Sequence, residues 1–270
     1  MADSVAELEA CAFRAWPAAE VALRGGWRLR WSEGLTRRGN SVLPVSATGA
    51  ATLDARIDEV LGFYAERGAP ARFQISPVAE PAGLDAALAA RGFAVEAPVS
   101  IRVADAGDVA AAAAPGELSA RVAGDPEGEW FAISGGRSRF TPQADVYRGF
   151  LRRIGARGGF AIAHRGGEPV AVGLGVVDGA WCGVFSMLTL PEHRRGGAGR
   201  AVLAALGRWA GARGAARLYL QVERDNAAAL RLYARAGFRE AYRYHYRVAD
   251  PARSALPSPR ATPPDRPRRP

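Results

Sequence analysis

The residues with the clearest capacity for chemistry lie in one stretch, residues 188–200, which reads LTLPEHRRGGAGR. Glycines adopt positive φ and let the backbone approach a ligand, so consecutive amide N–H groups can point into one concavity. At a helix N-terminus, unpaired N–H groups and the helix dipole favour an anion. Arg194, Arg195 and Arg200 would add charged donors for phosphate oxygens. The pattern predicts a pyrophosphate-binding turn, although a plain strand-to-helix turn uses the same residue types.

This turn follows neither of the common nucleotide-binding motifs. A P-loop requires Gly-Lys-Ser/Thr, and the chain contains no lysine. The G-x-G-x-x-G dinucleotide fingerprint is also missing from the sequence. What the turn offers instead is Arg194-x-x-Gly197-x-Gly199, preceded by Pro-Glu-His at 191–193.

With this motif the sequence resembles the GNAT superfamily of acetyl-CoA-dependent N-acetyltransferases. A second motif strengthens the resemblance, because residues 226–238 follow the superfamily pattern N-x-x-A-x-x-L-Y-x-x-x-G-F. The resemblance covers roughly residues 119–248. It implies an α/β (α+β) fold, with a mixed central sheet flanked by helices, and acetyl-CoA as the acetyl donor. The implied activity is acetyl transfer to a primary amine by direct attack in a ternary complex, without a metal ion.

The resemblance also implies roles for the motif residues. The backbone of the strand ending at Thr189 would pair with the pantetheine arm, and the glycine-rich turn would hold the pyrophosphate. Asn226 would hydrogen-bond the cofactor arm or help to splay the two strands near it. Tyr233 would protonate the departing thiolate, a role for which a phenol with a pKa near 10 suffices. The implied cofactor-binding residues are Met187, Leu188, Thr189, Arg194, Arg195, Gly196, Gly197, Ala198, Gly199, Arg200 and Asn226.

Each role has a structural alternative. Tyr233 lies in an amphipathic segment and could be a core residue, and Asn226 precedes a predicted helix and could be its N-cap. The arginines of the turn could be solvated surface residues. A non-catalytic acyl-CoA-binding sensor is the alternative function.

The general base is the least defined residue of the predicted site. Many GNAT members carry a glutamate five positions before the motif asparagine, but that position here is Gln221, which cannot take a proton at neutral pH. Glu223 has the same side-chain parity along the predicted strand and is the first candidate, with a chain of water molecules as the alternative. His245 could lie on the acceptor side, although its alternating aromatic segment is also typical of sheet packing.

The elements around these motifs alternate between strands and amphipathic helices. The predicted order in the carboxyl-terminal half is β-β-β-α-β-α-β, which favours a mixed sheet with helices against it. The strands are predicted at 160–163, 169–177, 181–190, 218–222 and 239–248, and the helices at 201–210 and 227–236.

The first hundred residues repeat this order in a shorter form. The segment LDAALAARGF near residue 90 matches AALRLYARAGF before residue 238, which indicates an internal duplication. Leu88 stands where Tyr233 stands in the second half, and no Arg-x-x-Gly-x-Gly precedes the first long helix. We therefore expect a lobe that has lost its cofactor and completes the acceptor pocket. Strands are predicted at 27–31, 41–45 and 72–75, and helices at 54–67 and 84–91.

Two composition breaks suggest the domain limits. Residues 104–119 are small and lack aromatic anchors, which is typical of an interdomain connection, and the segment after Asp250 is rich in proline and arginine. We predict a degenerate GNAT-like lobe at 1–106, a catalytic GNAT domain at 117–250 and a disordered basic tail at 251–270. Acceptor-binding loops are expected at 125–150, with Trp130, Phe131 and Phe140.

Composition bounds the remaining function classes. The 270 residues carry a net charge of +9, and all 36 basic residues are arginines. The tail holds five arginines against Asp265, so nucleic acid is an unlikely partner for the remainder. Two distant cysteines, three scattered histidines and an acidic amino terminus argue against a disulfide framework, a metal site and a signal peptide. We expect a cytoplasmic monomer or homodimer that is not membrane-bound and acts on a small-molecule or peptide amine.

Overall fold

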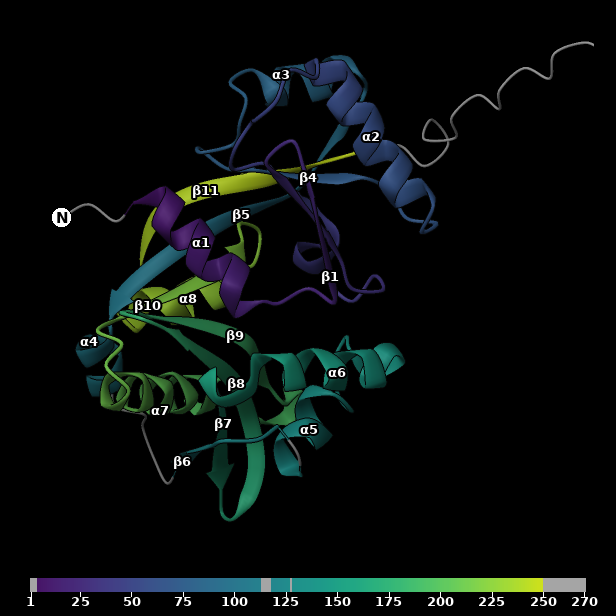
Figure 1. Cartoon of the computed structure of the whole chain (residues 1–270). Helices are drawn as coiled ribbons and strands as arrows, with labels where there is room; N and C mark the ends of the chain where they lie inside the picture. The colour runs from purple at the N-terminus through teal and green to yellow at the C-terminus, as the bar shows by residue number, and fades with distance from the viewer. Residues whose placement is uncertain (1–3, 113–117, 127, 250–270) are drawn as a thin grey trace, which may run out of the picture.

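A computed structural model describes residues 4–112, 118–126 and 128–249 of the chain, and its strands form one mixed sheet (Figure 1). The sheet contains eleven strands within these residues, in the order β1-β2-β3-β4-β11-β5-β10-β9-β8-β7-β6. The strands are β1 (Glu20–Arg24), β2 (Trp27–Trp31), β3 (Val42–Leu43), β4 (Arg72–Ile75), β5 (Ala94–Asp105), β6 (Leu118–Ala123), β7 (Gly158–Arg165), β8 (Glu168–Asp178), β9 (Trp181–Thr189), β10 (Arg217–Glu223) and β11 (Arg239–Val248).

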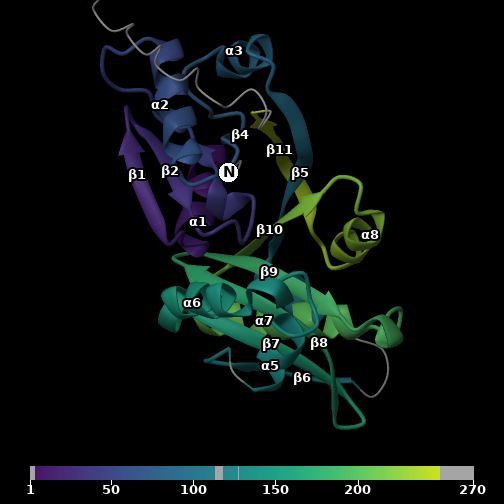
Figure 2. The same ribbon diagram turned by 90° about the vertical axis from the view of Figure 1, so that its right-hand side faces the viewer.

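Helices lie against this sheet in both halves of the molecule (Figure 2). They are α1 (Val5–Ala15), α2 (Leu53–Ala65), α3 (Leu84–Ala90), α4 (Ala106–Ala111), α5 (Glu129–Ser134), α6 (Ala144–Ile154), α7 (Ala198–Ala212) and α8 (Ala227–Arg235). None of the described helices is long and apolar enough to cross a membrane. The predicted basic tail at 251–270 lies outside the described residues.

The two halves repeat one pattern of strand pairing, which agrees with the predicted duplication. In the first half, β1–β2 and β2–β3 pair antiparallel and β3–β4 pair parallel across α2. In the second half, β7–β8 and β8–β9 pair antiparallel and β9–β10 pair parallel across α7. A parallel pair needs a crossover connection, and α2 and α7 supply it in the two halves.

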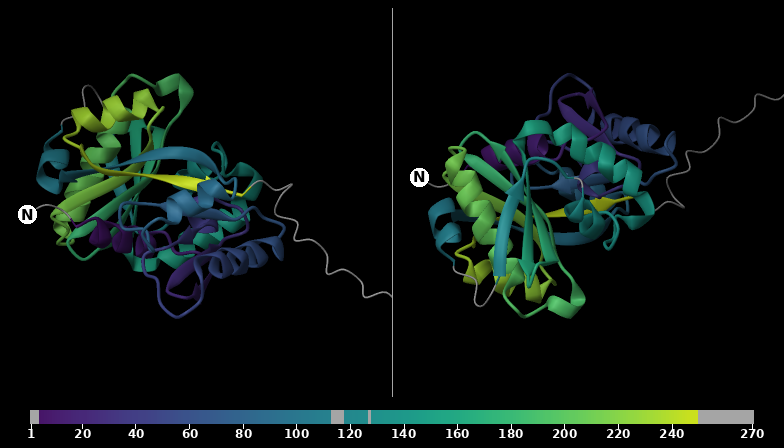
Figure 3. Two further views of the ribbon diagram at one scale, coloured as in Figure 1. Left: turned by 90° about the horizontal axis from the view of Figure 1, so that it is seen from above. Right: turned by 90° about the horizontal axis from the view of Figure 1, so that it is seen from below.

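The last strand of each half is inserted into the other half. β5 pairs antiparallel with both β10 and β11, and β11 pairs antiparallel with both β5 and β4. The two long strands cross the molecule side by side in Figure 3. The segments 1–106 and 117–250 therefore do not form two separate domains in the structure, because each contributes a strand to the sheet of the other.

The prediction that residues 104–119 form an interdomain connection is wrong for residues 104–111, which form the end of β5 and helix α4. Residues Ala106 and Val109 of α4 are buried against α7. Gly207 allows this contact, since a Cβ there would lie 2.8 Å from the backbone nitrogen of Ala110. The small residues of this segment are required by close helix packing rather than by flexibility.

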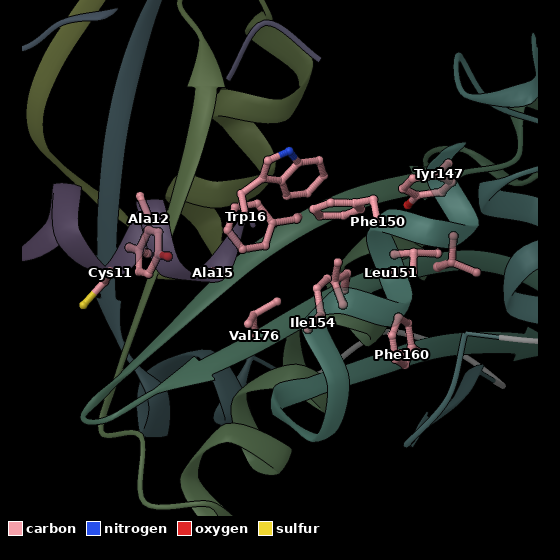
Figure 4. Packing of buried hydrophobic residues seen from close by; sticks show 14 of the residues in the cluster. Cys11, Ala12, Ala15, Trp16, Tyr147, Phe150, Leu151, Ile154, Phe160 and Val176 are labelled. Carbon is pink, nitrogen blue, oxygen red and sulfur yellow. The ribbon is translucent and has the colours of Figure 1, made fainter. Parts of the chain in front are cut away.

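An aromatic cluster joins α1 to the second half (Figure 4). Trp16, which follows α1, lies 4.0 Å from the ring of Phe150 and 5.2 Å from that of Phe185, measured between centroids. The Trp181 indole donates to Glu7 Oε1 at 2.9 Å. The first helix of the chain therefore packs on the carboxyl-terminal half and carries the following loop toward β9.

Candidate functional site

The strands β9 and β10 separate in the middle of the sheet. They pair with each other only over Trp181–Val184 and Arg217–Leu220, whereas β10 pairs with β5 on its other side along its whole length, Arg217–Glu223. A bulge at Ser186, where φ is +49°, bends β9 away from the β8 register. Beyond Val184 the edge of β9 that faced β10 has no strand partner in the described sheet, so its backbone groups are available to a ligand.

A cavity of about 700 Å³ lies where the strands separate. Both halves of the chain and the segment before α6 contribute to its walls. The lining residues are Trp16, Gly34, Leu35, Thr36, Arg37, Arg38, Ala97, Val99, Ser134, Ser138, Arg139, Phe140, Val184, Phe185, Ser186, Met187, Leu188, Gln221, Val222, Glu223, Asn226, Ala229, Tyr233, Tyr244 and Tyr246.

Tyr233 is buried on α8 and lines this cavity. Its ring packs edge-on against Phe238, with centroids 5.9 Å apart. The hydroxyl makes no hydrogen bond to any residue that the structure describes. Burial raises the pKa of Tyr233 to about 12, above the ordinary phenol value expected from the sequence. The side chain is therefore a neutral donor at physiological pH.

Asn226 is the N-cap of α8, as one of its two predicted roles requires. Its Oδ1 accepts a hydrogen bond from the Ala229 backbone at 3.1 Å. The residue also lines the cavity, immediately beyond the end of β10. It fixes the start of the helix that carries Tyr233.

The glycine-rich turn leads from β9 into α7 and leaves its amides free. Arg195 has φ +66°, and Gly197, the N-cap of α7, has φ +88°. The backbone N–H groups of residues 195–199 donate no hydrogen bond to the described chain. Five unpaired donors at the start of a fifteen-residue helix form an anion-binding arrangement.

Another arginine, not predicted from the sequence, lies at the turn. Arg165 at the end of β7 donates through Nη2 to Gly196 O at 2.7 Å. A Cβ at Gly199 would lie 3.1 Å from Leu232 Cδ2 and 3.6 Å from Thr189 Oγ1. The turn therefore lies beside the ends of β9 and α8, although Thr189 and residues 194–200 are not in the cavity wall itself.

Glu223 is the one carboxylate among the described residues of the cavity wall. It is bound to the first half of the chain, since Arg37 Nη1 donates to Glu223 Oε1 at 2.9 Å. Gln221 accepts a hydrogen bond from the Tyr244 hydroxyl at 2.9 Å. His245 does not reach the cavity: its Nε2 lies 3.0 Å from Asp85 Oδ1.

The predicted acceptor segment contributes only part of what was expected. Phe140 lines the cavity, whereas Trp130 and Phe131 are core residues. Trp130 is fully buried, and its indole donates to Gly173 O at 3.0 Å. Trp16 and residues 34–38 also line the cavity, although no motif in the sequence marks them.

The matching position of the first half cannot bind a pyrophosphate in the same way. Leu88 is fully buried in the core, at the place that corresponds to Tyr233. Arg56 lies in the first turn of α2. Its guanidinium donates to carbonyl oxygens of the chain around the start of this helix, those of Gly25, Thr48, Gly49 and Ala51. A side-chain cation surrounded by carbonyl oxygens thus replaces the free amides of the second half.

Comparison with known proteins agrees with this geometry. Residues 3–247 match the family described as "Probable histone acetyltransferase Rv0428c C-terminal". The chain belongs to this family of the GNAT superfamily. This acetyltransferase is also 30% identical over 251 residues to "Uncharacterized N-acetyltransferase YobR" of Bacillus subtilis (strain 168), which covers 91% of this chain and 99% of the relative.

Solved structures share the fold of this GNAT chain. A GCN5-related N-acetyltransferase from Kribbella flavida aligns with a TM-score of 0.71 at 19% identity, over 93% of this chain and 96% of that one. A tandem GNAT protein from the clavulanic acid biosynthesis pathway aligns with a TM-score of 0.58 at 16% identity, over 73% and 69% of the two chains. The mixed sheet and the tandem arrangement predicted from the sequence are confirmed.

Proposed function

We propose that the chain transfers an acetyl group from acetyl-CoA to a primary amine in a ternary complex. The observation that carries this proposal is the opening between β9 and β10, which brings a free strand edge and the Tyr233 hydroxyl to one cavity. Acetyl-CoA carries phosphate groups and amide groups. Its binding site therefore needs hydrogen-bond donors for the phosphates and main-chain groups that can pair with the amides. The described residues offer both types.

The residues present fit acetyl-CoA along its length. The β9 backbone at Met187, Leu188 and Thr189 would pair with the pantetheine amides, as a neighbouring strand would. The free amides of residues 195–199, with the side chains of Arg194 and Arg200, would hold the pyrophosphate. Bound acetyl-CoA supplies an acetyl group activated as a thioester.

Side chains of the protein then accept the proton that the amine loses and donate a proton to the leaving sulfur. The attacking amine must be neutral, and Glu223, or water held near it, accepts the proton that the nitrogen loses when the C–N bond forms. Tyr233 gives its proton to the sulfur as the C–S bond breaks, and the phenol is available because its raised pKa keeps it protonated. Backbone donors of the parted β9 edge would stabilise the developing oxyanion.

Replacing Tyr233 with phenylalanine tests this proposal. We expect acetyl transfer, followed as CoA release with an accepted amine, to slow by about 10²–10⁴-fold while acetyl-CoA affinity stays unchanged. Tyr219→Phe is the control, because the Tyr219 hydroxyl is buried without a hydrogen-bond partner in the described structure and does not line the cavity. Equal rates in the two variants would contradict the proposal, and binding without any CoA release would favour an acyl-CoA sensor.

A further inference from the structure

Three arginine side chains line the cavity, and their charges are not balanced by the described residues. Arg37 pairs with Glu96 and with Glu223, each at 2.9 Å. Arg38 and Arg139 form no ion pair with a described carboxylate. Two carboxylates, Glu96 and Glu223, therefore accompany three guanidinium groups, and net positive charge remains for a ligand.

Arg38 is held in the wall by aromatic rings. Its guanidinium carbon lies 5.2 Å from the ring centroid of Trp16 and 5.2 Å from that of Phe185. Its Nε is buried and has no hydrogen-bond acceptor in the described structure. The Arg38 charge is thus fixed in the wall without an ion-pair partner among the described residues, which favours a bound anion.

Arg139 also lines the cavity, from the segment before α6, with its guanidinium carbon 5.0 Å from the Phe140 ring centroid. Although the residue is exposed, desolvation of the guanidinium lowers the pKa of Arg139, the charge of Arg38 lowers it further, and the charge of Glu223 raises it. Like charges that face one cavity repel each other, and an anion between them relieves that repulsion.

We infer that the acceptor is a small amine that also carries an anionic group, a carboxylate or a phosphate, which Arg38 and Arg139 bind. This inference rests on the proposed acetyl transfer and adds the class of acceptor. Guanidinium groups suit both anions, because each offers two parallel N–H donors. A lysine-rich peptide would bring further positive charge to the cavity and is disfavoured.

The test compares matched acceptors that differ only in the anion. Amino acids are assayed against their methyl esters, and O-phosphoethanolamine against ethanolamine, with a lysine-rich peptide as a further acceptor. The enzymes are the wild type, Arg38→Gln, Arg139→Gln and the control Arg121→Gln, whose arginine pairs with Glu129 away from the cavity. Thermal unfolding checks that each variant is folded.

We expect at least one anionic acceptor to exceed its neutral partner by about 10- to 100-fold in kcat/KM with the wild type and the control. That advantage should fall below about threefold in either cavity variant, while KM for acetyl-CoA stays unchanged. Arg139→Gln, at an exposed position, keeps the test valid if Arg38→Gln fails to fold.

Three results would overturn the inference while leaving the proposed function intact. They are a preference for the neutral amines or the peptide, an anion preference unchanged in both variants, and a rise in KM for acetyl-CoA without a change for the acceptor. Absence of acetylation of every amine, despite acetyl-CoA binding, would instead refute the proposed function together with the inference.

Discussion

Replacing Gly197 with alanine should weaken acetyl-CoA binding specifically. Gly197 has φ +88°, and its carbonyl accepts the first hydrogen bonds of α7 from Arg200 and Ala201. An L-residue in the left-handed region costs about 1–2 kcal/mol. The turn is partly exposed and can relax when free, but the bound state needs the native backbone. Since 1.4 kcal/mol is tenfold, we expect Kd to rise about 5- to 30-fold.

Gly214→Ala is the matched control, measured by calorimetric titration of acetyl-CoA and by thermal unfolding. Gly214 lies just beyond the opposite end of α7 with φ +82°, and a Cβ there would contact nothing within 4 Å. Gly214→Ala should lose stability without losing affinity, whereas Gly197→Ala, whose turn relaxes in the free protein, should lose affinity with a smaller loss of stability. Unchanged affinity in Gly197→Ala, or an equal loss in both variants, would refute the assignment of this turn to the pyrophosphate.

Three further predictions follow from the strand exchange and from two buried groups. Residues 117–250 expressed alone should not give a folded domain by circular dichroism, because β10 and β11 both lose β5, whereas co-expression with 1–112, which keeps β5 and α4, should restore the signal. Burial raises the pKa of Glu9, so its contribution to stability is present below pH 4.5 and is lost as pH rises through the raised value; the Tm of the wild type relative to Glu9→Gln should fall with rising pH, and a constant difference would contradict this. Because the pKa of Tyr233 is raised to about 12, the kcat profile should show no descending limb between pH 7 and 9.5, and a limb near pH 9 would show that another group, or an unshifted phenol, supplies the proton.

Sequence patterns predicted the elements whose signals are local. The strands at 27–31 and 72–75 have the predicted bounds. Helix α7 is longer than predicted by three residues at its start and two at its end, and α8 ends one residue earlier than predicted. The helices α1, α4, α5 and α6 and the strands β1, β5 and β6 were not predicted. The missed β5 matters most, because it pairs with β10 and β11, more than a hundred residues later, and no local pattern encodes such partners.

The same distinction applies to the site. The turn at 194–200 and the helix with Asn226 and Tyr233 follow from short motifs whose geometry is set within one strand–helix unit. Arg37 and Arg38 follow β2 of the first half, and Arg139 comes from the segment between α5 and α6, yet all three line one cavity. Their meeting depends on tertiary contacts, so no local sequence pattern predicts the positive charge around Glu223.

Amide exchange of the turn at 195–199, followed residue by residue by NMR with and without acetyl-CoA, tests the central assignment most directly. These five N–H groups have no acceptor in the described chain, so they should exchange fast in the free protein and become protected when acetyl-CoA binds. The corresponding loop of the first half, residues 46–52, should not change, because its carbonyl oxygens face Arg56 and its Ala47 and Thr48 N–H groups already donate to Glu80 and Gly25. Unchanged exchange at 195–199 on saturation with acetyl-CoA, or protection at 46–52 instead, would contradict the account.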